Sequence, residues 1–256
     1  MRNTLAAEKS GWLPPNPLKH LRHYDLGNYA PDHVSGRIAP KYLGRHMNLR
    51  RAWVRICSHL PETTMPGAQY NILEFSTAHG AMLEIWEALG HRVRGTDFEV
   101  PEAHIKTYAP MKPRMKSAFE THHPHPIDPD RPGWAYQPVI ESIGVAVDLF
   151  DAGKTPYAYP DKSFDYICCY QALEAYAEPE DWGRIVSEFC RIARRAIVIG
   201  FNPPGRGQET DSNWTRTRAS WEALRVYDQN GFRNTLFELD ETGVGLHPTA
   251  VKLVAV

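Results

Sequence analysis

Two acidic residues stand near the ends of neighbouring apolar segments and could bind a ribose-containing ligand. Glu74 lies in the segment 71–75, and Asp97, which is 23 residues further on, ends the segment 91–97. A carboxylate at the end of a buried strand can accept hydrogen bonds from both hydroxyls of a ribose. Between them stand Ser76, Ala78 and Gly80, whose small side chains would let a ligand approach the backbone closely. This spacing indicates a ligand site at a strand-to-helix turn.

The elements that must position these residues alternate between strand and helix. We expect strands at 71–75, 91–97, 145–150, 164–170 and 196–201, and helices at 81–89, 180–193 and 221–230. Such alternation is typical of a doubly wound parallel sheet. Two further segments, 235–239 and 250–256, are joined through Gly243 and Gly245 and favour an antiparallel pair. The sequence therefore predicts an α/β fold with a mostly parallel sheet of about seven strands that ends in an antiparallel pair.

The first 66 residues read as an arm and a helix packed on this domain, which spans 67–256. Apolar or large side chains recur at steps of three and four from residue 41 to residue 60, which places them on one face of an amphipathic helix: Tyr42, His46, Leu49, Trp53, Ile56 and Leu60. Residues 101–138 interrupt the alternation with many prolines and with His122, His123 and His125. Because a compact domain does not need so long a loop, we expect a lid or substrate loop there.

Two stretches resemble the class I S-adenosylmethionine-dependent methyltransferases. In that family the first strand ends in the pattern E-x-G-x-G-x-G, and Glu74, Ser76, Ala78 and Gly80 occupy its positions with one glycine kept. Residues 159–174 read YPDKSFDYICCYQALE and are similar, without a gap, to the family pattern F-P-D-x-S-F-D-x-V followed by L-E-H. Ala175 stands where the family often has the histidine. The resemblance covers 71–101 and 139–256, and it implies a Rossmann-like fold that binds S-adenosylmethionine.

The resemblance also implies which residues meet this cofactor. Glu74, Ser76, Ala78 and Gly80 would lie against its methionine portion, and Asp97 would bind the ribose hydroxyls. Asp148 or Asp151 would meet the adenine amino group, and Leu149 or Phe150 the adenine ring. Cys169, Tyr170 and Gln171 would face the transferable methyl, and Phe98 is a further residue of the cofactor site. The cysteines match core thiols better than nucleophiles. The sequence does not name a general base, for which His46, His79 and His123 are candidates.

The implied activity is transfer of a methyl group to an oxygen or nitrogen of a small-molecule or saccharide-like acceptor. Residues 1–60 hold ten Lys and Arg against three Asp and Glu, and with the basic residues of the long loop they could hold a phosphate or carboxylate on the acceptor. The missing glycines and Ala175 leave open a non-catalytic binding or scaffold protein with this fold. A nucleic-acid methyltransferase is a lesser alternative, and a nicotinamide-dependent oxidoreductase would need G-x-G-x-x-G at the turn.

The composition indicates an ordinary globular protein and argues against a membrane span. The chain has 256 residues, of which 42% are hydrophobic and 23% charged, as in ordinary globular proteins. No apolar run reaches the roughly 20 residues of a membrane span, and residues 1–15 do not read as a signal peptide. Four cysteines are too few to stabilise a chain of this size through disulfides. The histidines at 122–125 lack the spacing of a helical metal site. We expect a cytoplasmic protein with reduced thiols and no metal; its oligomeric state is not indicated.

Overall fold

The computed structural model describes residues 13–25, 44–98, 134, 136–202, 212–242 and 245–256. The chain divides into two compact units. The first unit comprises Met1–Ala68 and Thr77–Phe150, and the second comprises Gln69–Ser76 and Asp151–Val256. The expected division into an arm of residues 1–66 and a domain of residues 67–256 stays a prediction. Most of the expected loop 101–138, including His122, His123 and His125, lies outside the described residues.

The described residues of the first unit form four helical elements and two strands. In chain order these are α3 (Arg45–His59), η2 (Pro61–Thr64), α4 (Ala81–Ala88), β2 (Arg92–Asp97), α6 (Gln137–Ile143) and β3 (Val147–Leu149). The strands β2 and β3 are parallel, and α3 packs against α4. The short helix α6 was not expected, because Pro138 and the surrounding prolines read as a loop; Pro in the first turn of a helix is in fact well tolerated.

The buried face of α3 agrees with the predicted stripe except at its start. Leu49, Trp53 and Ile56 are buried, as is Leu60 directly after the helix. His46 is exposed, so its placement on the apolar face was wrong. Because α3 begins only at Arg45, His46 lies in its first turn, and the buried residues of the helix begin at Asn48.

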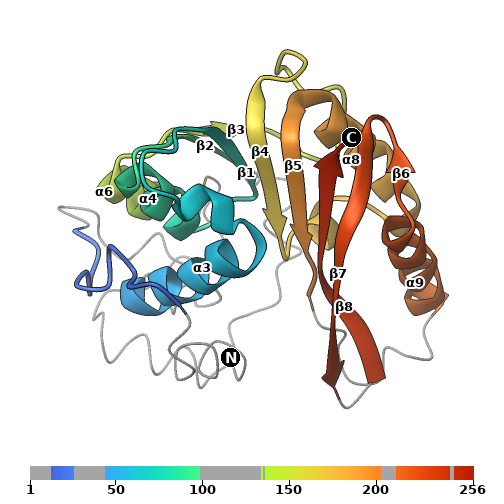
Figure 1. The fold of residues 1–256 in the computed structure, drawn as a ribbon, viewed down its shortest axis with the longest axis horizontal. Coiled ribbons are helices and arrows are strands. Elements are labelled where there is room, and N and C mark those ends of the chain that lie inside the picture. Colours follow the sequence, from blue (N-terminus) through green and yellow to red (C-terminus); the bar gives the residue numbers. More distant parts are fainter. Residues whose placement is uncertain (1–12, 26–43, 99–133, 135, 203–211, 243–244) are drawn as a thin grey trace. The chain divides into compact units, whose positions relative to one another are not determined.

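The second unit carries the longer part of the sheet. Its elements are β1 (Asn71–Phe75), β4 (Phe164–Tyr170), α7 (Leu173–Tyr176), η4 (Pro179–Asp181), α8 (Trp182–Ile192), β5 (Ala193–Gly200), α9 (Ser212–Arg225), β6 (Asp228–Gln229), β7 (Phe232–Thr242) and β8 (Gly245–Ala255). The strands β1, β4 and β5 are parallel neighbours, and β4, β5, β8 and β7 lie side by side (Figure 1). The helix α8 packs against β5, and α9 against β7 and β8.

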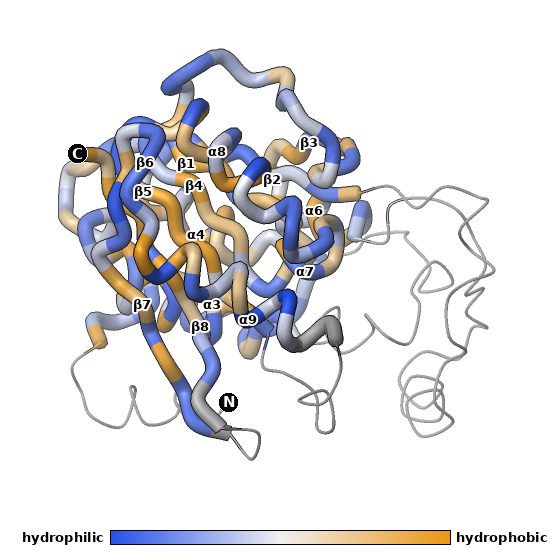
Figure 2. Tube along the Cα trace, turned by 90° about the vertical axis from the view of Figure 1, so that its right-hand side faces the viewer, coloured by the Kyte–Doolittle hydropathy of each residue, from blue (hydrophilic) through white to orange (hydrophobic). Residues whose placement is uncertain are grey.

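The second unit's core lies along its central strands. The hydrophobic stretch of β5 is visible in Figure 2, and its residues Ala196, Ile197, Val198 and Ile199 are all buried. Phe75 of β1 contacts Phe189 of α8, with ring centroids 4.6 Å apart. Strands that are apolar along their whole length are typical of parallel sheets covered on both faces.

The fold class is confirmed as an α/β, Rossmann-like arrangement. Hydrogen bonding orders the eight strands β3-β2-β1-β4-β5-β8-β7-β6. The strands from β3 to β5 are the parallel part, and β8, β7 and β6 form the antiparallel group at the C-terminal end. The sheet has one strand more than expected, because β6 extends the predicted antiparallel pair to three strands.

The additional strand replaces part of a predicted helix. The helix expected at 221–230 ends at Arg225 in the structure, and a tight hairpin follows. Its two turn residues, Asn230 and Gly231, have φ angles of 55° and 73°. Positive φ at both central residues defines the type I′ turn, for which Asn-Gly is the preferred dipeptide. The Asn-Gly pair was therefore a readable hairpin signal.

Three further properties follow from the described residues. No helix among them is long and apolar enough to cross a membrane. No group of three His, Cys, Asp or Glu side chains in the described ranges could hold a metal ion. The four cysteines, Cys57, Cys168, Cys169 and Cys190, are free and buried.

Candidate functional site

The loop after β1 has the backbone of a glycine-rich turn although it keeps one glycine. The φ angles are 54° at Ser76, 51° at Ala78 and 68° at Gly80. These are the three positions that the family pattern assigns to glycine. A residue with a Cβ atom pays about 1–2 kcal/mol for the left-handed conformation, and such strain is found mainly where function requires the shape. The loop thus adopts the expected conformation in spite of its side chains.

Two glycines let the loop pack closely within the first unit. The amide of Thr77 donates a hydrogen bond to a carbonyl of β2, with N and O 2.8 Å apart. A Cβ atom on Gly95 of β2 would lie 2.3 Å from the Thr77 hydroxyl oxygen, and one on Gly80 would lie 2.7 Å from the terminal methyls of Ile140 and Ile143. A side chain at Gly80 would therefore require the ends of the Ile140 and Ile143 side chains to shift and would be strained at a φ angle of 68°.

Asp97 lies at the end of β2, as predicted, and its carboxylate holds the loop. Its Oδ2 accepts a hydrogen bond from the Ala78 amide (3.2 Å) and one from the Trp134 indole (3.0 Å). Its Oδ1 accepts from the Phe98 amide (2.8 Å). A carboxylate offers about four acceptor positions, so most of them are occupied. No sequence pattern predicts the Trp134 contact, because this residue lies in the Pro-rich segment far from Asp97 in the chain.

The neighbouring strand presents Leu149 beside Asp97. The two residues are register partners in the β2–β3 pair, so their side chains share a face of the sheet. Leu149 is 42% exposed and Phe98 is 41% exposed, which is high for large apolar side chains. Asp148 points to the other face and accepts a hydrogen bond from Arg94 (2.6 Å). The first unit therefore offers two exposed apolar side chains next to the carboxylate of Asp97.

The three histidine candidates differ in their surroundings. The Nδ1 atom of His79 accepts a hydrogen bond from the Ala81 amide (3.3 Å), so in the neutral ring the proton lies on Nε2. His46 is exposed on α3. His123 lies outside the described residues.

In the second unit, the end of β4 is buried and uncharged. Cys169 is fully buried and its sulfur lies 3.1 Å from the Tyr176 hydroxyl. Burial raises the pKa of the Cys169 thiol to about 12, so the thiol is protonated at neutral pH and is a poor nucleophile. Glu74 is also buried, and its register partner in β4 is Cys168.

The chain turns sharply where β4 ends. Gln171 is exposed and has a φ angle of 56°, and its amide donates to the Gly200 carbonyl (2.7 Å). The ring of Tyr170 covers Gly200 so closely that a Cβ atom there would lie 2.2 Å from it. Glu174 follows, and its Oε1 accepts a hydrogen bond from the Asn202 amide (2.7 Å), which links α7 to the end of β5. Burial raises the pKa of Glu174.

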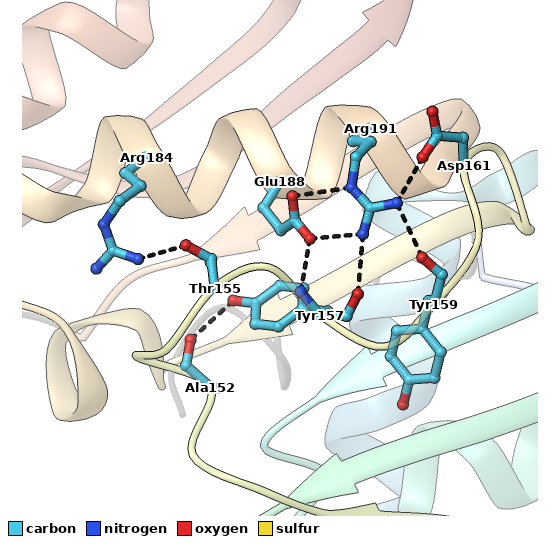
Figure 3. A network of polar contacts seen from close by, with 8 residues as sticks. All are labelled: Ala152, Thr155, Tyr157, Tyr159, Asp161, Arg184, Glu188 and Arg191. Atoms are coloured by element: carbon cyan, nitrogen blue, oxygen red, sulfur yellow. Dashed lines mark hydrogen bonds and ion pairs between the residues drawn. The ribbon is translucent and has the colours of Figure 1, made fainter.

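The segment that contains Asp151 is fastened to α8 (Figure 3). Asp151 Oδ1 accepts a hydrogen bond from the Gly153 amide (3.0 Å). Further along, Glu188 accepts from the Tyr157 amide (2.7 Å), and Arg191 donates to the carbonyls of Tyr157 and Tyr159 and to Asp161. Arg191 also pairs with Glu188, and this partner lowers the pKa of Glu188. The network holds the segment before β4 in one conformation.

Sequence reasoning also overlooked a histidine in β8. His247 is 1% exposed, and its Nδ1 atom has no hydrogen-bond partner among the described residues. Its register partner in β7 is Asp240. No motif includes this residue, and a single histidine in a strand is usually a core residue. Among the described residues His59 and His91 are buried as well, and His247 is the least exposed of the three.

Comparisons with known proteins agree with this description of the fold. The family model of the methionine biosynthesis protein MetW matches residues 137–206. A search of curated proteins found no significant match. Many solved structures are similar in fold.

Three of these solved structures show the range of similarity. Magnesium protoporphyrin IX methyltransferase from Synechocystis is 13% identical, with a TM-score of 0.46 over 83% of this chain and 84% of that one. A SAM-dependent methyltransferase from Aquifex aeolicus is 16% identical, with a TM-score of 0.41 over 79% and 93%. A 1,6-didemethyltoxoflavin-N1-methyltransferase from Burkholderia thailandensis is 15% identical, with a TM-score of 0.43 over 82% and 78%. These scores are low, so the strand order carries the assignment: the chain has the fold of class I S-adenosylmethionine-dependent methyltransferases.

Proposed function

We propose that the chain binds S-adenosylmethionine and transfers its methyl group to an oxygen or nitrogen of a small-molecule or saccharide-like acceptor. The observation that carries the proposal is the left-handed backbone at Ser76, Ala78 and Gly80. Two of these residues would adopt another conformation more easily, yet the loop keeps the shape that brings backbone close to a ligand. A turn that only connected a strand to a helix would not require it.

The residues of the first unit fit the adenosyl part of this cofactor. Asp97 would accept hydrogen bonds from the ribose hydroxyls, in place of the one it now accepts from the Trp134 indole. The side chains of Phe98 and Leu149 would lie against the adenine ring, and the shared register of Leu149 with Asp97 favours Leu149 over Phe150 for this contact. The resemblance leaves Asp148 and Asp151 as candidates for the adenine amino group; Asp148 points away from the face of Asp97 and pairs with Arg94, which disfavours it, and Asp151 belongs to the second unit. Ala78 and Gly80 would leave room for the methionine portion.

For the methionine portion and the methyl group, the methyltransferase resemblance assigns Glu74, Ser76 and the end of β4. When bound, S-adenosylmethionine supplies a methyl group on a sulfonium, and rate enhancement comes mainly from aligning an acceptor atom with it. Gln171, exposed in its strained turn, would help to orient the acceptor, while Tyr170 and the protonated Cys169 would form an uncharged wall. A hydroxyl acceptor also benefits from a general base. His79 remains a candidate, and the base would be its Nδ1 atom, which would have to exchange the Ala81 amide for the acceptor hydroxyl. The basic residues of the N-terminal segment would favour an anionic acceptor.

The alternatives make different predictions for ligand binding. Titration calorimetry with S-adenosylmethionine, S-adenosylhomocysteine and NAD separates them. The proposed function predicts saturable heats with both adenosyl ligands and none with NAD. A scaffold protein that has lost its cofactor would give no heat with any of the three at millimolar concentration, and an oxidoreductase would respond to NAD.

Asp97 provides the residue-level test of the same proposal. Asp97→Ala should weaken the binding of S-adenosylhomocysteine by at least about tenfold, which corresponds to about 1.4 kcal/mol. The matched control is Asp228→Ala, since Asp228 is an exposed carboxylate paired with Arg233 on the β6–β7 hairpin. An unchanged affinity in Asp97→Ala would remove Asp97 from the site, and an equal loss in both variants would point to a non-specific charge effect.

A further inference from the structure

The indole of Trp134 occupies an acceptor position on the carboxylate that the proposed function assigns to the ribose. Its Nε1–H donates to Asp97 Oδ2 (3.0 Å), and the Ala78 amide donates to the same oxygen (3.2 Å). A carboxylate oxygen has two lone pairs, so both acceptor positions of Oδ2 are taken. A ribose whose two hydroxyls engage both carboxylate oxygens would therefore have to displace one of these donors.

Of the three hydrogen bonds described for Asp97, only the one from Trp134 comes from a side chain. The other two come from backbone amides, at Ala78 in the left-handed loop and at Phe98 directly after Asp97. Moving either amide would change the conformation of the loop or of the end of β2. A tryptophan side chain, by contrast, can leave by rotation between its rotamers while the backbone stays in place. The indole is therefore the donor that a ligand can displace.

The backbone of Trp134 is held, whereas its side chain is not part of the core. The Trp134 carbonyl accepts a hydrogen bond from the Gln137 amide at the start of α6 (3.1 Å), and two isoleucine side chains of α6 lie against the loop at Gly80. Trp134 itself is only partly buried. Rotation of the ring away from Asp97 would thus expose little core surface and would leave the indole N–H to water.

We propose that Trp134 is an autoinhibitory residue, whose indole closes the ribose position of Asp97 in the free protein and leaves when an adenosyl ligand binds. This inference rests on the proposed function and adds a regulatory contact to the same site. A hydrogen bond to a charged acceptor is stronger than one between neutral groups, so the closed form predominates without ligand. Because the ligand binds the open form, its apparent affinity is reduced by the fraction of the protein that is open.

The substitution Trp134→Phe tests the competition directly, because phenylalanine keeps an aromatic ring but cannot donate to Asp97. We expect this variant to bind S-adenosylhomocysteine at least about threefold more tightly than wild type in titration calorimetry. The control is Trp53→Phe, which removes an indole donor to the Pro14 carbonyl (2.7 Å) and should leave the affinity unchanged. Equal or weaker binding by Trp134→Phe would overturn the proposal, and so would equal tightening in both variants.

A second measurement follows the indole in the wild-type protein. The Trp134 N–H should exchange slowly with water in the free protein and faster at saturating S-adenosylhomocysteine. Proton NMR measures this rate at the indole resonance that is missing from the spectrum of Trp134→Phe. The indole of Trp182, which donates to the Ala177 carbonyl (3.2 Å), serves as the reference and should keep its rate.

The outcomes separate this inference from the proposed function. An exchange rate at Trp134 that does not change with ligand would show that the indole stays on Asp97, and would overturn the proposal. If wild type does not bind S-adenosylhomocysteine, the proposed function fails and this inference fails with it. If wild type binds the ligand while Trp134 gives the contradicting result in either experiment, only this inference fails.

Discussion

At the scale of single residues, the backbone conformation at Ser76 and Ala78 differs from what their residue types suggest. The sequence shows that both side chains are small, and this suggested that the loop had lost part of its glycine character. Both residues nevertheless adopt left-handed conformations, with φ angles of 54° and 51°. The loop's amides donate hydrogen bonds to Thr96 and Asp97, and these bonds hold the left-handed conformations. Such hydrogen bonds cannot be predicted from residue types.

A glycine at position 78 should therefore stabilise the protein. Ala78→Gly removes about 1–2 kcal/mol of left-handed strain and costs about 0.5–1 kcal/mol in backbone entropy, so we expect a net gain of about 0.5 kcal/mol. Urea denaturation measures it. The control is Ala81→Gly, the same substitution in the first turn of α4, which should destabilise the protein. A loss of stability in Ala78→Gly would show that the loop is not strained there.

Glu174 should make stability depend on pH. Burial raises its pKa above the ordinary value of 4.5, so the unfolded chain releases this proton at a lower pH than the folded one. Stability then falls as pH rises from the unfolded pKa through the folded pKa. Glu174→Gln keeps an acceptor for the Asn202 amide and cannot titrate. Its free energy of unfolding should therefore rise relative to that of wild type across this pH window, by about 1.4 kcal/mol for each unit by which the pKa of Glu174 is raised.

The measurement is urea denaturation of both proteins from acidic to neutral pH. Glu222→Gln, at an exposed glutamate of α9, serves as control and should show no such trend. If the difference between Glu174→Gln and wild type does not grow with pH, Glu174 is not desolvated in the folded protein.

At the scale of elements, α8 holds the segment between β3 and β4 through Glu188 and Arg191 (Figure 3). Arg191→Met would leave the buried Glu188 carboxylate without its partner and the carbonyls of Tyr157 and Tyr159 without a donor. We expect a loss of about 2 kcal/mol in the free energy of unfolding. Arg225→Met removes an exposed pair with Glu222 and should cost at most about 0.5 kcal/mol. Similar losses in the two variants would show that the network adds little.

Strands and helices of the sheet were predictable because their period is local. The strand at Phe164–Tyr170 was predicted to the residue, and the helix expected at 180–193 is found at Trp182–Ile192. The errors lie at the ends of elements. A predicted helix ends earlier because the Asn230-Gly231 turn forms a hairpin, and Pro138 lies in the first turn of a helix where a loop was predicted. In both cases the meaning of the residue depends on its position in the turn or helix.

At the scale of the whole molecule, candidate site residues were predictable only where they follow a strand. Asp97, Ala78 and Gly80 were found because a motif places them at strand ends. Trp134 was not, because its hydrogen bond to Asp97 is made only in the folded chain. Tertiary contacts between distant segments have no period in the sequence.

The buried cysteines give a test of the core as a whole. All four are free and buried, and burial raises the pKa of Cys57 to about 11 and of Cys169 to about 12. A thiol-specific reagent such as Ellman's reagent should therefore label none of them rapidly in the native protein and all four after denaturation. Rapid labelling of one native cysteine, identified by mass spectrometry, would show that its part of the core opens in the folded protein.

The central claim is that the strained loop and Asp97 bind an adenosyl cofactor. The most direct measurement is a crystal structure of the protein grown with S-adenosylhomocysteine. The account predicts ligand density with the ribose hydroxyls at the Asp97 carboxylate and the amino-acid chain beside Gly80. A structure at saturating ligand in which this density is absent, or lies away from Asp97 and Gly80, would contradict it.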